Sequence, residues 1–103
     1  MKDLTITAHI NIYQYDELKE ADRTLIDAAK KATDRSYVPY SHFHVGAAVR
    51  LEDGAVLTGC NQENAAYPSG LCAERTTIFY ANAKFPDLAI TTLAIAARTE
   101  KDF

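Results

Sequence analysis

Apolar and polar residues alternate near the start of the chain. Every second position is apolar, at Leu4, Ile6, Ala8, Ile10 and Ile12, and the intervening residues are Thr, His or Asn. A period of two predicts a strand or an extended arm with one buried face. We therefore expect residues 1–15 to form an N-terminal arm that precedes the first helix.

The period becomes helical between residues 15 and 36. Apolar side chains recur there at steps of three and four, at Leu18, Ala21, Leu25, Ala28, Ala29 and Ala32. This spacing predicts an amphipathic helix, for which Asp16 is a candidate N-cap. The alanine-rich stripe favours close packing on a flat surface such as a sheet.

The next segment has the pattern of a β-hairpin. Its strands are expected at 43–51 and 55–60, with a turn at Asp53-Gly54. The first strand carries small side chains on both faces, because it contains Gly46, Ala47 and Ala48. Small residues at these positions would let a helix or another chain approach closely.

A polar loop over 61–70 precedes a second predicted helix, at about 71–84. Candidates for the inner face of this helix are Ala73, Ile78, Phe79 and Ala83. An apolar run from Leu88 predicts a strand covered on both sides. The helix between the hairpin and this strand indicates a right-handed crossover. The expected product is one α/β domain, a three-layer sandwich whose last strand exposes an apolar edge.

Composition narrows the possible functions. The 103 residues carry a net charge of −3, which argues against non-specific binding to nucleic acid. The sequence shows neither a membrane-spanning apolar run nor the apolar core of a signal peptide, so we expect a cytoplasmic protein without a membrane partner. In a reducing compartment Cys60 and Cys72 should be thiols, and two cysteines cannot form a closed four-thiolate zinc site.

Cys72 and Glu74 lie where the second helix is expected to begin. Free backbone N–H groups and the helix dipole favour a thiolate there, and a thiolate is a good zinc ligand. Residues two apart diverge by roughly 200° around a helix axis, so Glu74 could reach a metal-bound water only if the metal lay over the helix end. This spacing alone is more commonly explained without a metal, by a buried Cys and by a Glu that complements the helix dipole.

Two longer runs change this interpretation. "YVPYSHFHVGAAV" and "GCNQENAAYPSGLCAERTTI" closely resemble the homotetrameric zinc-dependent cytidine deaminases, and the resemblance extends over residues 16–97. It implies a three-layer α/β/α sandwich with a mixed sheet, truncated after the third core strand. It also implies hydrolytic deamination of cytidine or deoxycytidine to uridine or deoxyuridine, a reaction of pyrimidine salvage. Cys72-Ala73-Glu74 matches the first half of the zinc deaminase signature, whose second half is P-C-x-x-C.

The resemblance implies roles at the start of the second helix. Cys72 would ligate Zn²⁺, and Arg75 would hydrogen-bond the metal thiolates. Glu74 would carry a proton from the zinc-bound water to N3 of cytosine and then to departing ammonia. Ala73 would offer backbone groups to the base.

The resemblance implies further roles in substrate binding. Phe43 would stack on the pyrimidine ring, and Asn61 and Glu63 would hydrogen-bond the ribose hydroxyls. Ala65 and Tyr67 would reach the site of a neighbouring subunit in the tetramer. Each of these residues also has an ordinary structural interpretation when it is taken singly.

The second half of the signature is missing, because no cysteine follows Cys72. We therefore expect residues 1–103 to be the N-terminal part of a longer deaminase whose two remaining Cys ligands lie beyond residue 103. This chain alone should be inactive and metal-poor. Cys60 is expected to be a buried thiol, and the His42/His44 pair has no counterpart among the family's ligands. The alternatives are a deaminase of a related base or nucleoside antibiotic, or a metal-free nucleoside-binding or structural deaminase-like protein.

Overall fold

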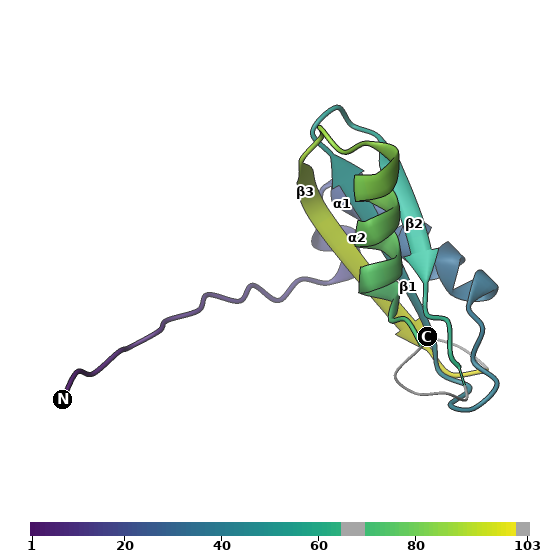
Figure 1. The fold of residues 1–103 in the computed structure, drawn as a ribbon. Helices are drawn as coiled ribbons and strands as arrows, with labels where there is room; N and C mark the ends of the chain where they lie inside the picture. The colour runs from purple at the N-terminus through teal and green to yellow at the C-terminus, as the bar shows by residue number, and fades with distance from the viewer. Residues whose placement is uncertain (65–69, 101–103) are drawn as a thin grey trace.

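A computed structural model describes residues 1–64 and 70–100 (Figure 1). The elements follow in the order η1 (Tyr15–Glu17), α1 (Glu20–Ala32), η2 (Thr33–Arg35), β1 (His44–Leu51), β2 (Val56–Cys60), α2 (Ala73–Lys84) and β3 (Ile90–Arg98). The three strands form one sheet, with α1 behind it and α2 in front of it (Figure 1). The expected three layers are therefore present.

β1 is the central strand of the sheet, whose order is β2-β1-β3. Ala47 of β1 lies opposite Gly59 of β2 and Ile95 of β3, and both pairings are antiparallel. β2 and β3 consequently run in the same direction on either side of β1, as a strand–helix–strand connection requires. The sheet was expected to be mixed, whereas the pairings among these three strands are antiparallel because β1 separates the two parallel strands. An isolated parallel bridge joins Tyr37 to Gln62 outside the strands.

Glycines in two strands let both helices approach the sheet closely. A Cβ added at Gly46 would lie 2.8 Å from the backbone nitrogen of Thr33, at the end of α1. A Cβ added at Gly59 would lie 3.0 Å from the backbone nitrogen of Thr77 in α2. Real Cβ atoms rarely come this close to a backbone atom, so the close approach predicted for residues 43–51 is confirmed on the α1 side.

Each face of the sheet has its own apolar cluster. Under α1 the cluster consists of Leu25, Ala29, Ala48 and Ala94. Under α2 it consists of Val49, Leu51 and Ala81. The alanine-rich stripe of α1 thus packs on the sheet as its spacing predicted. Neither α1 nor α2, the α-helices of the described part of the chain, has the length and hydropathy that would let it cross a bilayer.

Two helix details differ from the sequence predictions. Asp16 is not the N-cap of α1, because it lies in η1 and the chain is extended at Leu18 before the helix begins after Lys19. The inner face of α2 consists of Ala73, Thr77 and Ala81, at steps of four residues. Ala73 was predicted correctly, but Ile78, Phe79 and Ala83 are exposed. Thr77 takes an inner position, where it packs against the space that Gly59 leaves open.

The N-terminal arm has no buried residue. Residues 1–14 contain no helix or strand, and the arm extends away from the body of the molecule (Figure 1). One face of the arm was predicted to be buried, but its apolar side chains are exposed, so that prediction is wrong for the described residues. The alternating side chains lack a surface to pack on among the described residues.

We predict that Gly46→Ala destabilises the fold by about 1–3 kcal/mol, because the added methyl group meets backbone atoms of Ala29 and Thr33 that cannot rotate away. Urea unfolding followed by circular dichroism measures the difference. Thr58→Ala, at an exposed position of β2, is the matched control and should change stability by less than about 0.5 kcal/mol. Equal midpoints for the two variants would contradict close packing at Gly46.

Candidate active site

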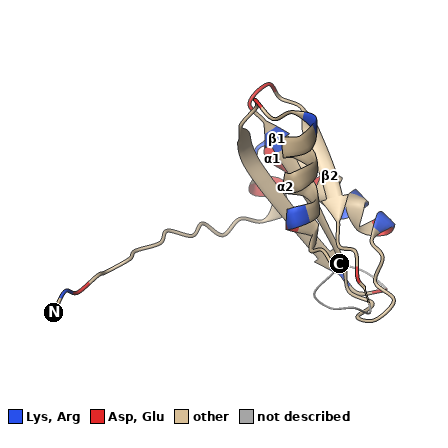
Figure 2. Ribbon diagram, in the orientation of Figure 1, with Lys and Arg blue, Asp and Glu red and all other residues tan. Residues whose placement is uncertain are grey.

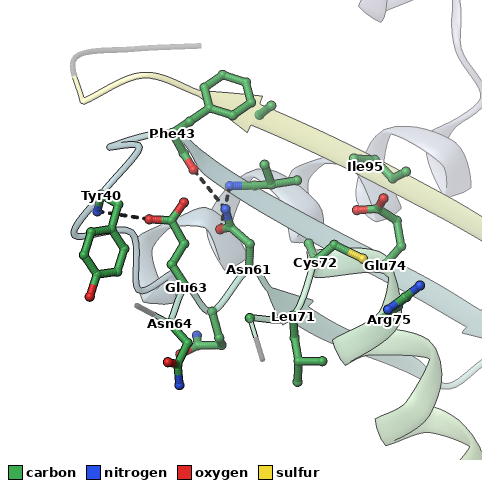
Figure 3. A pocket seen from close by; sticks show the side chains of 15 residues that line it. Tyr40, Phe43, Asn61, Glu63, Asn64, Leu71, Cys72, Glu74, Arg75 and Ile95 are labelled. Atoms are coloured by element: carbon green, nitrogen blue, oxygen red, sulfur yellow. Dashed lines mark hydrogen bonds between the residues drawn. The ribbon is translucent and has the colours of Figure 1, made fainter. Parts of the chain in front are cut away.

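A cavity of about 980 Å³ lies where β1 and α2 begin and where β2 and β3 end (Figure 3). Ligands commonly bind at such a place, because the carboxyl ends of parallel strands and the start of a helix converge there. The cavity is lined by seven predicted site residues: Phe43, Asn61, Glu63, Cys72, Ala73, Glu74 and Arg75. The other two, Ala65 and Tyr67, lie outside the described residues.

Cys72 is the N-cap of α2 and precedes its first turn. Its backbone is extended, with φ −76° and ψ 160°, and its side chain is exposed. The prediction that Cys72 belongs to the first helical turn is therefore wrong by one position. Because Cys72 lies outside the helix, the helical divergence of roughly 200° does not separate it from Glu74. Figure 3 shows both side chains directed into the cavity.

The start of α2 is held in place by buried small residues. Ala73 is fully buried, and its carbonyl accepts a 2.7 Å hydrogen bond from Thr77 Oγ1. Glu74 and Arg75 follow, half-buried and exposed respectively, and Glu74 faces Ile95 of β3 across the cavity (Figure 3). A carboxylate in this position can exchange protons with a water or ligand in the cavity.

Among the described residues, Cys72 is the cysteine that lines this cavity. Cys60 is buried and accepts a hydrogen bond from Gln62 Nε2 at 3.3 Å, so the prediction of a buried thiol is confirmed. Residues 1–64 and 70–100 contain no group of three or more His, Cys, Asp or Glu that could hold a metal. A catalytic zinc site uses three protein ligands. Cys72 is a suitable thiolate donor, but the described residues do not form a zinc site by themselves.

Asn61 holds the start of β1. Its Nδ2 donates to the carbonyl of Phe43 at 3.0 Å, and its Oδ1 accepts from the backbone N–H of Val45 at 3.1 Å. The side chain thus binds the backbone on both sides of His44, as a neighbouring strand would. Through these bonds Asn61 fixes the position of Phe43 at the cavity wall (Figure 3).

Glu63 binds the loop that precedes Phe43. Its Oε1 accepts hydrogen bonds from the backbone N–H groups of Tyr40 and Ser41, both at 3.1 Å. Hydrogen bonding by Ser41, first through its side chain and then through its backbone, is the main cause that lowers the pKa of Glu63 below its ordinary value. Tyr40 and the nearby His42 act in the same direction. Glu63 is therefore an anionic acceptor at neutral pH.

Glu100 makes a contact beside the site that the sequence did not reveal. Its two carboxylate oxygens bind His42 Nδ1 at 3.0 Å and His44 Nε2 at 3.1 Å. Hydrogen bonding to His44 and then to His42 lowers the pKa of Glu100. Phe43 lies between these histidines, so the end of β3 is tied to the segment that carries the aromatic ring. No local signal could have found this contact, because more than 50 residues separate its partners.

The chain is similar in sequence and fold to known cytidine deaminases. The cytidine deaminase of Halalkalibacterium halodurans is 45% identical over 76 residues, which cover 72% of this chain and 58% of that protein. The cytidine deaminase of Sporosarcina psychrophila is 56% identical over 57 residues, 55% of this chain and 42% of that protein. The crystal structure of cytidine deaminase from Burkholderia pseudomallei superposes with a TM-score of 0.68 at 44% identity, and covers 74% of this chain and 61% of that one.

This chain therefore spans between 42% and 61% of the length of these relatives. A family model described as the cytidine and deoxycytidylate deaminase zinc-binding region matches residues 19–99. This match includes both helices, all three strands and every described residue of the predicted site. The chain belongs to the cytidine and deoxycytidylate deaminase family.

Proposed function

We propose that the complete protein hydrolyses cytidine and deoxycytidine to uridine and deoxyuridine with release of ammonia. The observation that carries this proposal is the juxtaposition of Cys72 and Glu74 at the start of α2, in the same cavity as Phe43 (Figure 3). A thiol and a carboxylate directed into one cavity beside an aromatic ring suit a metal-assisted hydrolysis of a flat base. The names of the relatives support the same activity.

The size and lining of the cavity support a nucleoside as the substrate. A volume of about 980 Å³ is within the usual range for small-molecule sites. Phe43 would stack on the pyrimidine, and the backbone of Ala73 would meet its polar edge. Asn61 and Glu63 would hydrogen-bond the ribose hydroxyls. The negative charge of Glu63 would repel a phosphate group and so favour a free nucleoside over a nucleotide.

Glu74 would carry the proton during hydrolysis. It would accept a proton from the water that attacks C4 and pass it to N3. It would then take the proton of the new C4 hydroxyl and give it to the amino group, so that the C4–N bond breaks, ammonia leaves and the C4 carbonyl of uridine forms. Zn²⁺, when bound, supplies the Lewis acidity that makes water nucleophilic near neutral pH. Cys72 would be one of its ligands, with two more Cys ligands expected beyond residue 103, and Arg75 would hydrogen-bond the thiolates.

Three finer features rest on the family resemblance. We propose a homotetramer in which Ala65 and Tyr67 contact the site of a neighbouring subunit. We also propose a cytoplasmic location and a role in pyrimidine salvage.

The alternative is a deaminase-like protein that binds nucleosides, or supports an active partner chain, without a metal. The zinc content of the complete protein separates the two.

We predict that Glu74→Gln lowers kcat of the complete protein for cytidine by at least about 10²-fold, because the amide cannot carry the proton. Uridine formation is followed by the change in ultraviolet absorbance. Glu52→Gln, in the hairpin turn, is the matched control and should retain the original rate. If Glu74→Gln turned cytidine over at the original rate, Glu74 could not be the proton carrier.

We predict that Cys72→Ser removes most of the zinc from the complete protein, because an alcohol at the start of α2 is a much poorer zinc ligand than a thiolate. Elemental analysis of the dialysed protein gives the zinc content directly and does not depend on turnover. Cys60→Ala is the control and should leave the zinc content unchanged. A complete protein that contains no zinc even before substitution would favour the metal-free alternative.

We predict that Ser41→Ala raises the pKa of Glu63 toward its ordinary value of about 4.3, because the largest cause of the lowered pKa is removed. Carbon-13 NMR of the side-chain carboxyl of Glu63 follows the titration in this chain. A carboxyl whose pKa is lowered by folding stabilises the folded loop above the unfolded pKa, and this contribution is lost as pH falls through the folded pKa. Thr24→Ala, in α1, should leave the Glu63 titration unchanged.

A further inference from the structure

The two residues that flank Phe43 bind the same carboxylate. Glu100 contacts His42 Nδ1 through one oxygen and His44 Nε2 through the other. His42 has a φ of 57°, in the left-handed region that residues other than glycine seldom occupy. Such a conformation persists only where surrounding contacts hold it. The backbone direction at Phe43, and with it the place of the ring at the cavity, therefore depends on this bridge (Figure 3).

His44 has a polar partner on each side of its ring. Its second nitrogen, Nδ1, is in hydrogen-bond contact with Ser36 Oγ, and the same hydroxyl donates to the carbonyl of Thr33 at 2.7 Å. The His44 side chain is only 13% exposed, so water has little access to replace these partners. We call the three contacts from the Thr33 carbonyl through Ser36 and His44 to Glu100 the His44 network.

The number of hydrogens in the His44 network determines the charge of its ring. The Thr33 carbonyl and an ionised carboxylate can only accept hydrogen bonds, and the Ser36 hydroxyl has one hydrogen. A neutral His44 adds one hydrogen, so one of the three contacts would bring two acceptors together. An imidazolium adds two hydrogens, and each contact then has its donor. Because an unsatisfied buried acceptor is costly, these contacts favour the protonated ring.

The charges around His44 also favour a cation. Hydrogen bonding to His44, and then to the second histidine of the bridge, keeps the pKa of Glu100 below its ordinary value, so its carboxylate is ionised at neutral pH. η2 carries one acidic and one basic residue, Asp34 and Arg35 (Figure 2). Arg98 pairs with His44 across the sheet, but Asp34 binds its guanidinium at 3.0 Å and compensates its charge. The negative charge of Glu100 is therefore the main charge in contact with the ring.

We propose that protonated His44 is a positioning residue for Phe43 and holds the aromatic ring where a pyrimidine can stack on it. When His44 loses its proton, its network lacks one hydrogen, and the contact with Glu100 loses the strength of a bond between two ions. The affinity for a pyrimidine nucleoside should therefore fall as pH rises through the titration of His44. The step to the nucleoside rests on the proposed function, whereas the control of Phe43 by His44 does not.

NMR titration of the complete protein tests the link to Phe43 without substrate or turnover. Nitrogen-15 shifts of His44 give the midpoint of its titration, and the ring protons of Phe43 should shift with the same midpoint. Ser36→Ala removes the acceptor for the Nδ1 hydrogen and should move both midpoints together to lower pH. His9→Gln, in the N-terminal arm, is the control and should leave both unchanged. A Phe43 ring that does not follow the titration of His44 overturns the proposal.

Calorimetric binding of uridine, the product of the proposed reaction, tests the consequence for the site. Its dissociation constant should rise at least about threefold from the low-pH end to the high-pH end of the His44 titration, because a charge-assisted hydrogen bond is weakened. His44→Gln should bind weakly at every pH in this range. His44→Lys keeps a permanent positive charge near Glu100 and should bind tightly at every pH in this range.

The pair of His44 variants separates the charge from a merely structural role. Equally weak binding by His44→Lys and His44→Gln overturns the proposal, provided that circular dichroism shows both to be folded. An unchanged pH dependence in His44→Gln overturns it as well, because another group would then be titrating. If the original protein bound no uridine at any pH, the proposed function would be contradicted, and the Phe43 titration would decide this inference by itself.

Discussion

The close contact between α2 and β2 determines where the chemistry of this protein lies. Gly59 leaves space for Thr77, and Thr77 in turn hydrogen-bonds the carbonyl of Ala73 at the start of the helix. Because these contacts are between backbone and small side chains, α2 cannot slide along the sheet without a clash. Cys72 and Glu74 are therefore positioned by the packing of regular elements, and a site built on such elements holds its geometry better than one built on loops alone.

The opposite wall of the cavity is held by hydrogen bonds from side chains to the backbone. There, the side chain of Asn61 hydrogen-bonds the backbone on both sides of His44. Glu63 accepts hydrogen bonds from the backbone N–H groups of Tyr40 and Ser41. These two side chains are also the proposed ribose ligands. Substrate binding and loop order thus share the same hydrogen-bonding groups, so a substitution at either residue affects both at once.

Much of this architecture could be predicted from the sequence, because it depends on local periodicity. The hairpin around Asp53-Gly54, the helical stripe and the buried Cys60 all follow from residues that lie close together in the chain. Glu100 could not be found in this way, since its contacts with His42 and His44 arise only when β3 pairs with β1. The exposure of Ile78 could not be found either, because the helical period does not say how much of a helix the sheet covers.

The bridge from Glu100 to two histidines also affects the register in which β3 pairs with β1. β3 is rich in Ala, Ile and Thr, and such a uniform strand offers few side chains that distinguish one alignment from the next. A slip by one residue would turn Leu93 and Ile95 to the opposite face and carry Glu100 away from both imidazoles. The bridge lies just beyond the pairing of His44 with Arg98, and it therefore favours the observed register of β3 against β1.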